Sequence, residues 1–260
     1  MFPLAIQFQP GYNILIIVGE VCPYKAGCVM FTGFPEETMQ FFLDIRFHND
    51  KAYFAEHKAR YEKDVKAVFH AFIEELAPTM QGIDPLMEIR PYKCLARIHR
   101  DTRFSKDKSP FRDHLWLCFR RAAEPREGSV NFFFEVGPTT LGWGMGTWGE
   151  NRPMMDVLRR RIAAEPAKIA KIVESCHLAE NDFNVYNQVW KRMEVPPGIP
   201  LGLKGWYCSR EVYVGKGHPD MTKVGTREIL DIVREDFKTL APLYHLLRGA
   251  YEEAAVDQSL

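Results

Sequence analysis

Hydrophobic residues recur with a helical period in the first part of the chain. Apolar side chains at steps of three and four predict one helix over residues 35–47 and a longer one over residues 51–76. Charged residues occupy the opposite face of the longer helix, as expected for an amphipathic helix that packs on a core. Pro78 and the turn at 82–85 are expected to end it, because proline removes a helical hydrogen bond.

The pattern then changes to a period of two. Residues 93–100 alternate apolar and polar side chains, which predicts a half-buried strand. Three aromatic-rich segments, 115–119, 131–136 and 141–148, are separated by short turns and are predicted as further strands. Connections this short favour antiparallel pairing, because parallel strands need a long crossover.

Helical patterns return in the second half of the chain, over residues 153–163, 166–175 and 226–253. Thr226 is the expected N-cap of the last helix, and Pro242 should break or kink it. The Pro- and Gly-rich segment 195–217 is predicted as an ordered loop with at most one strand. Helices, then strands, then helices predict a single α+β domain whose helices pack on one face of an antiparallel sheet.

We expect this domain to span residues 31–255. Residues 1–30 lack a helical period, and Met30 directly precedes the first well-patterned segment. This stretch is predicted to be an N-terminal extension or a mis-assigned start, or alternatively an edge strand. Its apolar run at 14–18 is too short for a membrane span or a signal-peptide core. The sequence therefore predicts a cytoplasmic protein without a membrane partner.

Composition narrows the chemistry further. The chain has 34 basic and 34 acidic residues, so the whole molecule has no field that attracts nucleic acid at long range. The 6 cysteines form no C-x-x-C motif, and the 8 histidines show no metal-ligand spacing. We expect reduced thiols, no metal and no cofactor. Oligomeric state and any enzymatic activity remain open at this level.

Charge is nevertheless concentrated in one segment. Residues 97–126 contain nine basic and four acidic residues. Arginine forks gathered in a loop can hold a carboxylate or phosphate by bidentate hydrogen bonds. The loop at 97–114 is therefore a candidate site for a phosphate- or carboxylate-bearing small molecule or nucleotide. Its expected ligand-binding residues are Arg97, Arg100, Arg103, Lys106, Lys108 and Arg112.

Two other interpretations fit the same loop. Asp101, Asp107 and Asp113 could pair with the cations and make the loop a salt-bridged structural clasp. The basic patch could also bind nucleic acid or a protein without catalysis, although the neutral balance of the chain does not favour nucleic acid. The glycines at 142, 144 and 146 do not form a phosphate-binding loop. They lie in a strand pattern, where glycine marks a bend or a close backbone approach.

Four side chains near this loop are weak catalytic candidates. His99 and Asp101 could form a base with its orienting carboxylate, but an exposed imidazole beside an ion pair is the favoured alternative. His114 could complete an anion cage or simply start the next strand. Glu135 either faces water or pairs with a neighbouring arginine, for which Arg97 or Arg103 is expected, since an unpaired buried carboxylate is costly.

His57 is the remaining weak candidate. It lies on the apolar stripe of the long helix, where a lone histidine is more often a core residue than an acid or base.

Several of these motifs together resemble the family called domain of unknown function 2461. The resemblance is carried by residues 31–35, the corner from Asn49 to His57, the long motif at 97–110 and residues 144–146. It covers nearly the whole chain after residue 30 and implies one α+β domain without an assigned activity. The chain departs from the family pattern at three places. Members often have Trp at the position of Tyr53, Tyr or Asn at the position of His99, and Lys-Thr in place of Arg112-Asp113. The second departure weakens His99 as a catalyst.

Overall fold

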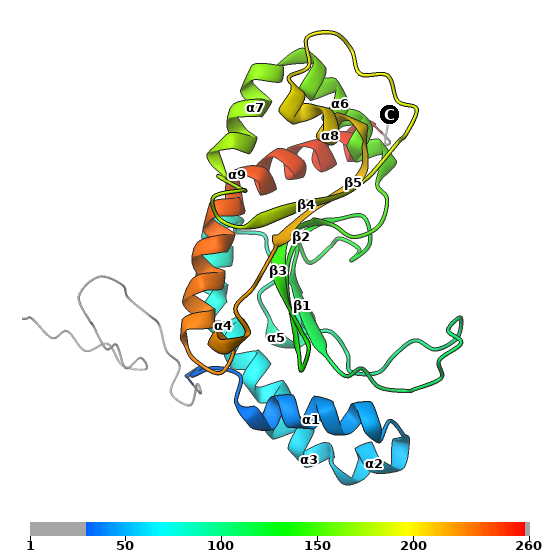
Figure 1. Cartoon of the computed structure of the whole chain (residues 1–260), viewed down its shortest axis with the longest axis vertical. Coiled ribbons are helices and arrows are strands. Elements are labelled where there is room, and N and C mark those ends of the chain that lie inside the picture. The colour runs from blue at the N-terminus through cyan, green and yellow to red at the C-terminus, as the bar shows by residue number, and fades with distance from the viewer. Residues whose placement is uncertain (1–29, 258–260) are drawn as a thin grey trace, which may run out of the picture.

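A computed structural model describes residues 30–257 (Figure 1). The predicted N-terminal extension or edge strand lies outside these residues, apart from Met30. The structure contains a five-stranded sheet in the order β1-β2-β3-β5-β4, and every neighbouring pair is antiparallel. Its strands are β1 Leu115–Phe119, β2 Val130–Gly137, β3 Thr140–Thr147, β4 Phe183–Val189 and β5 Ser209–Lys216.

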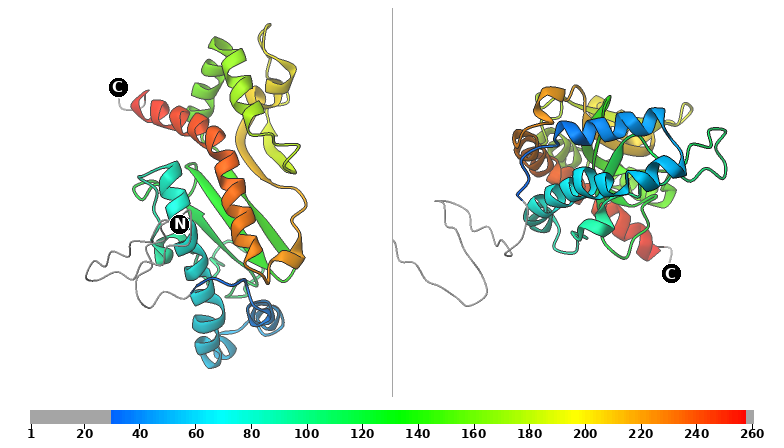
Figure 2. Two further views of the ribbon diagram at one scale, coloured as in Figure 1. Left: turned by 90° about the vertical axis from the view of Figure 1, so that its left-hand side faces the viewer. Right: turned by 90° about the horizontal axis from the view of Figure 1, so that it is seen from below.

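Two long helices cover one face of this sheet. Helices α4 (Ala67–Ile83) and α9 (Glu228–Asp257) lie side by side over it (Figure 2). Phe132 and Phe134 of β2 are fully buried, with ring centroids 4.9 Å from Phe237 and 4.6 Å from Phe72, respectively. The α+β fold with helices packed on an antiparallel sheet is therefore confirmed.

The other helices lie mainly beyond the two ends of the sheet (Figure 1). They are α1 Glu36–Phe47, α2 Lys51–Glu56, α3 Lys58–Arg60, the π-helical turn η1 Tyr61–Lys66, α5 Pro91–Cys94, α6 Arg152–Ala164, α7 Pro166–Ser175, α8 Leu201–Cys208 and the 3₁₀ turn η2 Met221–Lys223. The predicted helices at 35–47, 153–163 and 166–175 are confirmed. No helix in the described part of the chain is long and apolar enough to cross a membrane.

The predicted continuous helix over 51–76 is wrong in two respects. It is interrupted near His57 and by η1, and it continues past Pro78 to Ile83, where the predicted turn at 82–85 does end it. Leu76 and Met80, on either side of the proline, are fully buried. Their packing offsets the hydrogen bond that Pro78 removes, so the helix does not end there.

The predicted strand over 93–100 is also wrong. Pro91 occupies the first turn of the short helix α5, where its fixed φ suits a helix. After α5 the chain forms only isolated antiparallel bridges, Leu95 with Leu117 and His99 with Phe111. The apolar and polar alternation therefore reflects a segment that lies along the edge of β1 without becoming a sixth strand.

The C-terminal third also differs from the prediction in detail. Segment 195–217 contains helix α8 as well as one strand, and β4 was not predicted. Thr226 is not the N-cap of α9, because its hydroxyl donates to the Lys223 carbonyl and the helix starts at Glu228. Pro242 lies within α9, which changes direction along its length (Figure 1).

The glycines of β3 allow the sheet to pack closely. A Cβ atom at Gly144 would lie 1.9 Å from the Val214 carbonyl oxygen of β5, and one at Gly146 would lie 2.4 Å from the Cα of Tyr213. Gly146 also has a φ of +148°. The interpretation as a close backbone approach is confirmed for Gly144 and Gly146, whereas a Cβ atom at Gly142 would meet nothing within 4 Å.

Candidate functional site

The basic segment before β1 forms a projecting loop whose base is firmly held (Figure 1). The Arg100 amide donates to the Pro110 carbonyl at 2.8 Å, and the Arg112 amide donates to the Ile98 carbonyl at 2.9 Å. Asn49, in the corner between α1 and α2, accepts from the Phe111 amide and donates to its carbonyl, both at 2.9 Å. The loop base is thus fixed to the sheet edge and to the helical corner.

A pocket of about 420 Å³ lies where the loop base meets this corner. Its lining combines three guanidinium groups, two carboxylates, an imidazole and an amide. The lining residues are Arg46, Asn49, Arg100, Asp107, Ser109, Phe111, Arg112, Asp113 and His114. Two segments that are far apart in the sequence therefore build one site.

Two of the three pocket arginines have carboxylate partners. Arg46 Nε donates to Asp113 Oδ2 at 2.7 Å, and Arg100 forms an ion pair with Asp107. The hydrogen bonds from Arg46 and His114 lower the pKa of Asp113 and outweigh its burial. Both aspartates are therefore charged near neutral pH and already hold a cation.

Arg112 is different because its charge has no carboxylate partner in residues 30–257. Its guanidinium lies over the Trp116 ring, 4.2 Å from the centroid, and its buried Nε has no hydrogen-bond acceptor among the described residues. Burial, followed by repulsion from Arg100 and Arg97, lowers its pKa. A buried donor without an acceptor is costly, so Arg112 differs from the other two pocket arginines in both its charge balance and its hydrogen bonding.

Four of the predicted ligand-binding residues do not line the pocket: Arg97, Arg103, Lys106 and Lys108. Arg103 is bound to Asp101 in a two-pronged ion pair, with Nη2 2.7 Å from Oδ2. Lys108 donates to the Thr102 carbonyl at 2.9 Å. Of the six predicted residues, only Arg100 and Arg112 face the pocket.

The sequence did not identify the contributions of Arg46 and Asn49. Arg46 lies in the last turn of helix α1, and Asn49 lies in the corner that follows it. The corner was noted only because it resembles a family motif, and no local pattern connects it with a loop some 60 residues later.

His114 is the one predicted catalytic candidate that lines the pocket. Its Nδ1 lies 2.9 Å from Asp113 Oδ1, and its Nε2 lies 3.3 Å from Glu135 Oε1. Glu135 therefore contacts His114 rather than the expected Arg97 or Arg103. A histidine between two carboxylates can hold or exchange a proton at the pocket wall.

The other candidates lie elsewhere. The His99 ring contacts the rings of Phe54 and Phe111, while Asp101 is engaged by Arg103, so the two do not form a dyad. The His57 ring stacks on Tyr53 with centroids 4.0 Å apart, and its Nδ1 lies 2.9 Å from a backbone carbonyl. Neither histidine lines the pocket.

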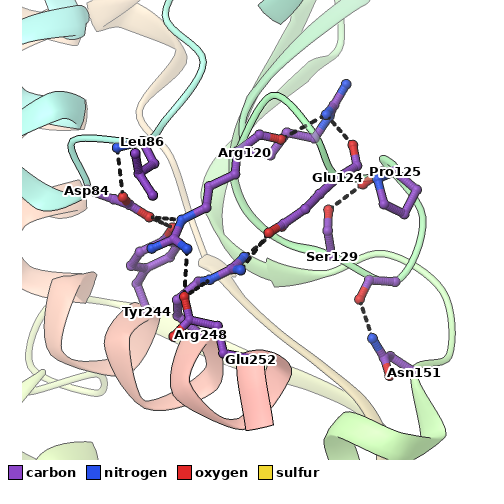
Figure 3. Close-up of polar contacts among 12 residues, drawn as sticks. Asp84, Leu86, Arg120, Glu124, Pro125, Ser129, Asn151, Tyr244, Arg248 and Glu252 are labelled. Atoms are coloured by element: carbon purple, nitrogen blue, oxygen red, sulfur yellow. Dashed lines mark hydrogen bonds and ion pairs between the residues drawn. The ribbon is translucent and has the colours of Figure 1, made fainter. Parts of the chain in front are cut away.

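The C-terminal part of the basic segment belongs to a buried ionic network (Figure 3). Arg121 Nε donates to Asp84 at 2.8 Å and its Nη1 to Glu252 at 2.6 Å. The Tyr244 hydroxyl donates to the same Asp84 carboxylate at 2.6 Å, and Arg248 pairs with Glu124. These groups join the end of α4, the segment after β1 and helix α9, and each of the two arginines is paired with carboxylates of the protein itself.

One family profile covers most of the chain. Residues 37–246 match the profile of a family described as conserved hypothetical protein (DUF2461). No functionally curated protein matches the chain. The matched region contains both halves of the pocket, the helical corner and the basic loop. The chain belongs to the DUF2461 family.

Proposed function

We propose that this protein binds a small molecule through a phosphate or carboxylate group, and that Arg112 is the main anion ligand. The observation that carries the proposal is the half-buried Arg112 guanidinium, which lines the pocket with a buried, unsatisfied Nε and no counter-charge among the described residues. An anion placed there would supply the missing negative charge and could accept hydrogen bonds from Nη1 and Nη2, which have no partner among the described residues.

The remaining pocket charges support an anion of low charge. Three arginines face two aspartates, which leaves one net positive charge before any contribution from His114. A guanidinium has five N–H donors, and Arg100 uses only one of them, at Nη1, for Asp107. Arg46 and Arg100 can therefore add hydrogen bonds to a ligand without leaving their aspartates. We also place the protein in the cytoplasm, because its cysteines show no disulfide framework.

Calorimetric titration with inorganic phosphate, acetate and a nucleoside monophosphate tests this function. We expect Arg112→Met to raise the dissociation constant at least about tenfold, since a charge-assisted hydrogen bond contributes roughly 1.5–3 kcal/mol. Arg103→Met is the matched control, because Arg103 lies in the same loop but outside the pocket. Equal affinities for the wild type and Arg112→Met would refute the proposal, as would failure of the wild type to bind any of the three anions at millimolar concentration.

A further inference from the structure

The tip of the basic loop, residues 101–106, extends directly from the pocket wall. Arg100 and Asp107 both line the pocket and form an ion pair, so the residues between them make a closed loop that starts and ends at the pocket. The side chain of Phe104 in this tip is 94% exposed. Its only ring contact among the described residues is with the Arg103 guanidinium, 5.7 Å from the centroid.

The basic side chains around Phe104 have N–H donors that make no hydrogen bond to the described part of the protein. Lys106 makes no hydrogen bond or ion pair within residues 30–257. Lys108 gives one hydrogen bond to a carbonyl, and Arg103 uses Nε and Nη2 for Asp101 but not Nη1. The nearby carboxylates are already engaged by arginines. These exposed donors therefore face water in the free protein, and a partner with anionic groups can replace that water.

A ligand confined to the pocket does not explain this tip. Neither Phe104 nor Lys106 lines the pocket, so a small anion at Arg112 leaves the bare ring and the free ammonium in water. The partner that would use them must extend beyond the pocket and offer both anionic groups and flat apolar surfaces.

We propose that the loop binds single-stranded nucleic acid. A base stacks on the open face of Phe104, phosphates contact Lys106 and Lys108, and a further phosphate occupies the pocket at Arg112. The last contact rests on the function proposed above.

Single strands fit this tip better than the other polyanions. They present unstacked base faces beside regularly spaced phosphates, which is the combination that aromatic and basic side chains recognise together. A duplex keeps its base faces stacked inside the helix, and an acidic protein would need a preformed apolar cavity for the ring of Phe104.

Fluorescence anisotropy with a labelled oligothymidine measures this binding in the intact protein. Residues 97–114 contain six basic and three acidic residues, so about three to four phosphates should be neutralised. The log–log salt dependence should then have a slope of roughly −2 to −3 at ~0.7 per phosphate. Phe104→Ala should weaken binding roughly 5- to 150-fold, the loss expected for one stacked base, while Phe104→Trp should retain it.

The controls separate stacking from charge and this inference from the proposed function. Phe104 is exposed, so both variants should keep the wild-type melting temperature and the wild-type affinity for inorganic phosphate. Stacking is overturned if Phe104→Ala binds the oligonucleotide as the wild type does. Absence of oligonucleotide binding at low salt, with phosphate binding intact, overturns the nucleic-acid partner alone. An acidic polypeptide that binds more tightly than the oligonucleotide, and loses affinity in Phe104→Ala, would show that the partner is a protein.

Discussion

Two arginines of the same basic segment should respond in opposite ways to the same substitution. Arg121 lies in the buried network and holds Asp84 and Glu252, whereas Arg112 holds no carboxylate in the described part of the chain. Methionine keeps much of the unbranched side chain and removes the charge and the donors. We expect Arg121→Met to destabilise the fold, and Arg112→Met to leave its stability nearly unchanged while weakening anion binding.

The loss at Arg121 follows from the burial of its partner. Asp84 is 3% exposed, and without Arg121 its carboxylate keeps only the Tyr244 hydroxyl at 2.6 Å and the Leu86 amide at 2.9 Å. Removing one member of a buried ion pair costs about 3–5 kcal/mol, and the two surviving hydrogen bonds favour the lower end, about 3 kcal/mol. For a domain of this size the melting temperature should fall by roughly 6–12 °C.

The near-neutral effect at Arg112 comes from two opposing terms. Arg112→Met loses the cation–π contact with Trp116, worth about 0.5–2 kcal/mol. It also removes a buried, unsatisfied donor, whose relief is worth about 1–3 kcal/mol. The free energy of unfolding should therefore change by less than about 1 kcal/mol.

Urea unfolding followed by circular dichroism tests both values. Combining Asp84→Asn with Arg121→Met should recover at least about half of the lost stability, because a neutral amide needs no counter-charge and can still accept from Tyr244. A loss below about 1 kcal/mol in Arg121→Met, or an equal loss in Arg121→Met and Arg112→Met, would refute the division of this segment into a structural part and a binding part.

Other parts of the fold give further predictions. Gly33→Ala should lower the free energy of unfolding in urea by more than about 2 kcal/mol, because Gly33 has a φ of +129° and an added Cβ would lie 2.3 Å from a carbonyl oxygen. An unchanged free energy of unfolding would contradict this geometry. Trp143→Phe should cost about 1–3 kcal/mol by the same measurement, since the buried Asp236 loses the indole donor at 2.7 Å, and an unchanged midpoint would show that this bond is not needed. Hydrogen bonds from Arg90 lower the pKa of Glu88 to about 2. The resulting stability is present above the ordinary pKa of about 4.5 and should be lost as the pH falls toward 2; Glu88→Gln should remove this part of the acid dependence, and an identical acid profile would contradict it.

Local sequence patterns correctly predicted several helices and the first three strands. The helices at 36–47 and 152–164 have apolar residues at steps of three and four, and strands β1 to β3 are aromatic-rich segments between short turns, so local sequence and tertiary packing agree. Helix α8 was missed because Gly202 and Gly205 disfavour a helix, while the packing of Leu203 and Trp206 in the core stabilises it. Strand β4 was missed because three of its seven residues are Asn or Gln, which leaves little apolar alternation.

The composition of the basic loop indicated a site, but its geometry could not be predicted. Asp101 and Asp107 are interleaved with several cations, and sequence spacing does not decide which carboxylate engages which guanidinium. The folded loop pairs Arg103 with Asp101 and Arg100 with Asp107. That assignment depends on backbone conformation, and it is what leaves Arg112 as the unpaired cation in the pocket.

The location of the pocket follows from contacts between the helical corner and the base of the loop. Asn49 uses its amide to hold both backbone groups of Phe111, and Arg46 holds Asp113 two residues later. These contacts fix the backbone on either side of Arg112 to the α1–α2 corner, at the point where the chain enters β1. Because a guanidinium without a counter-charge would otherwise turn toward water, this anchoring and the Trp116 ring are what keep Arg112 half-buried. The helical corner is thus as necessary to an anion site here as the basic loop, although only the loop carries a recognisable excess of charge.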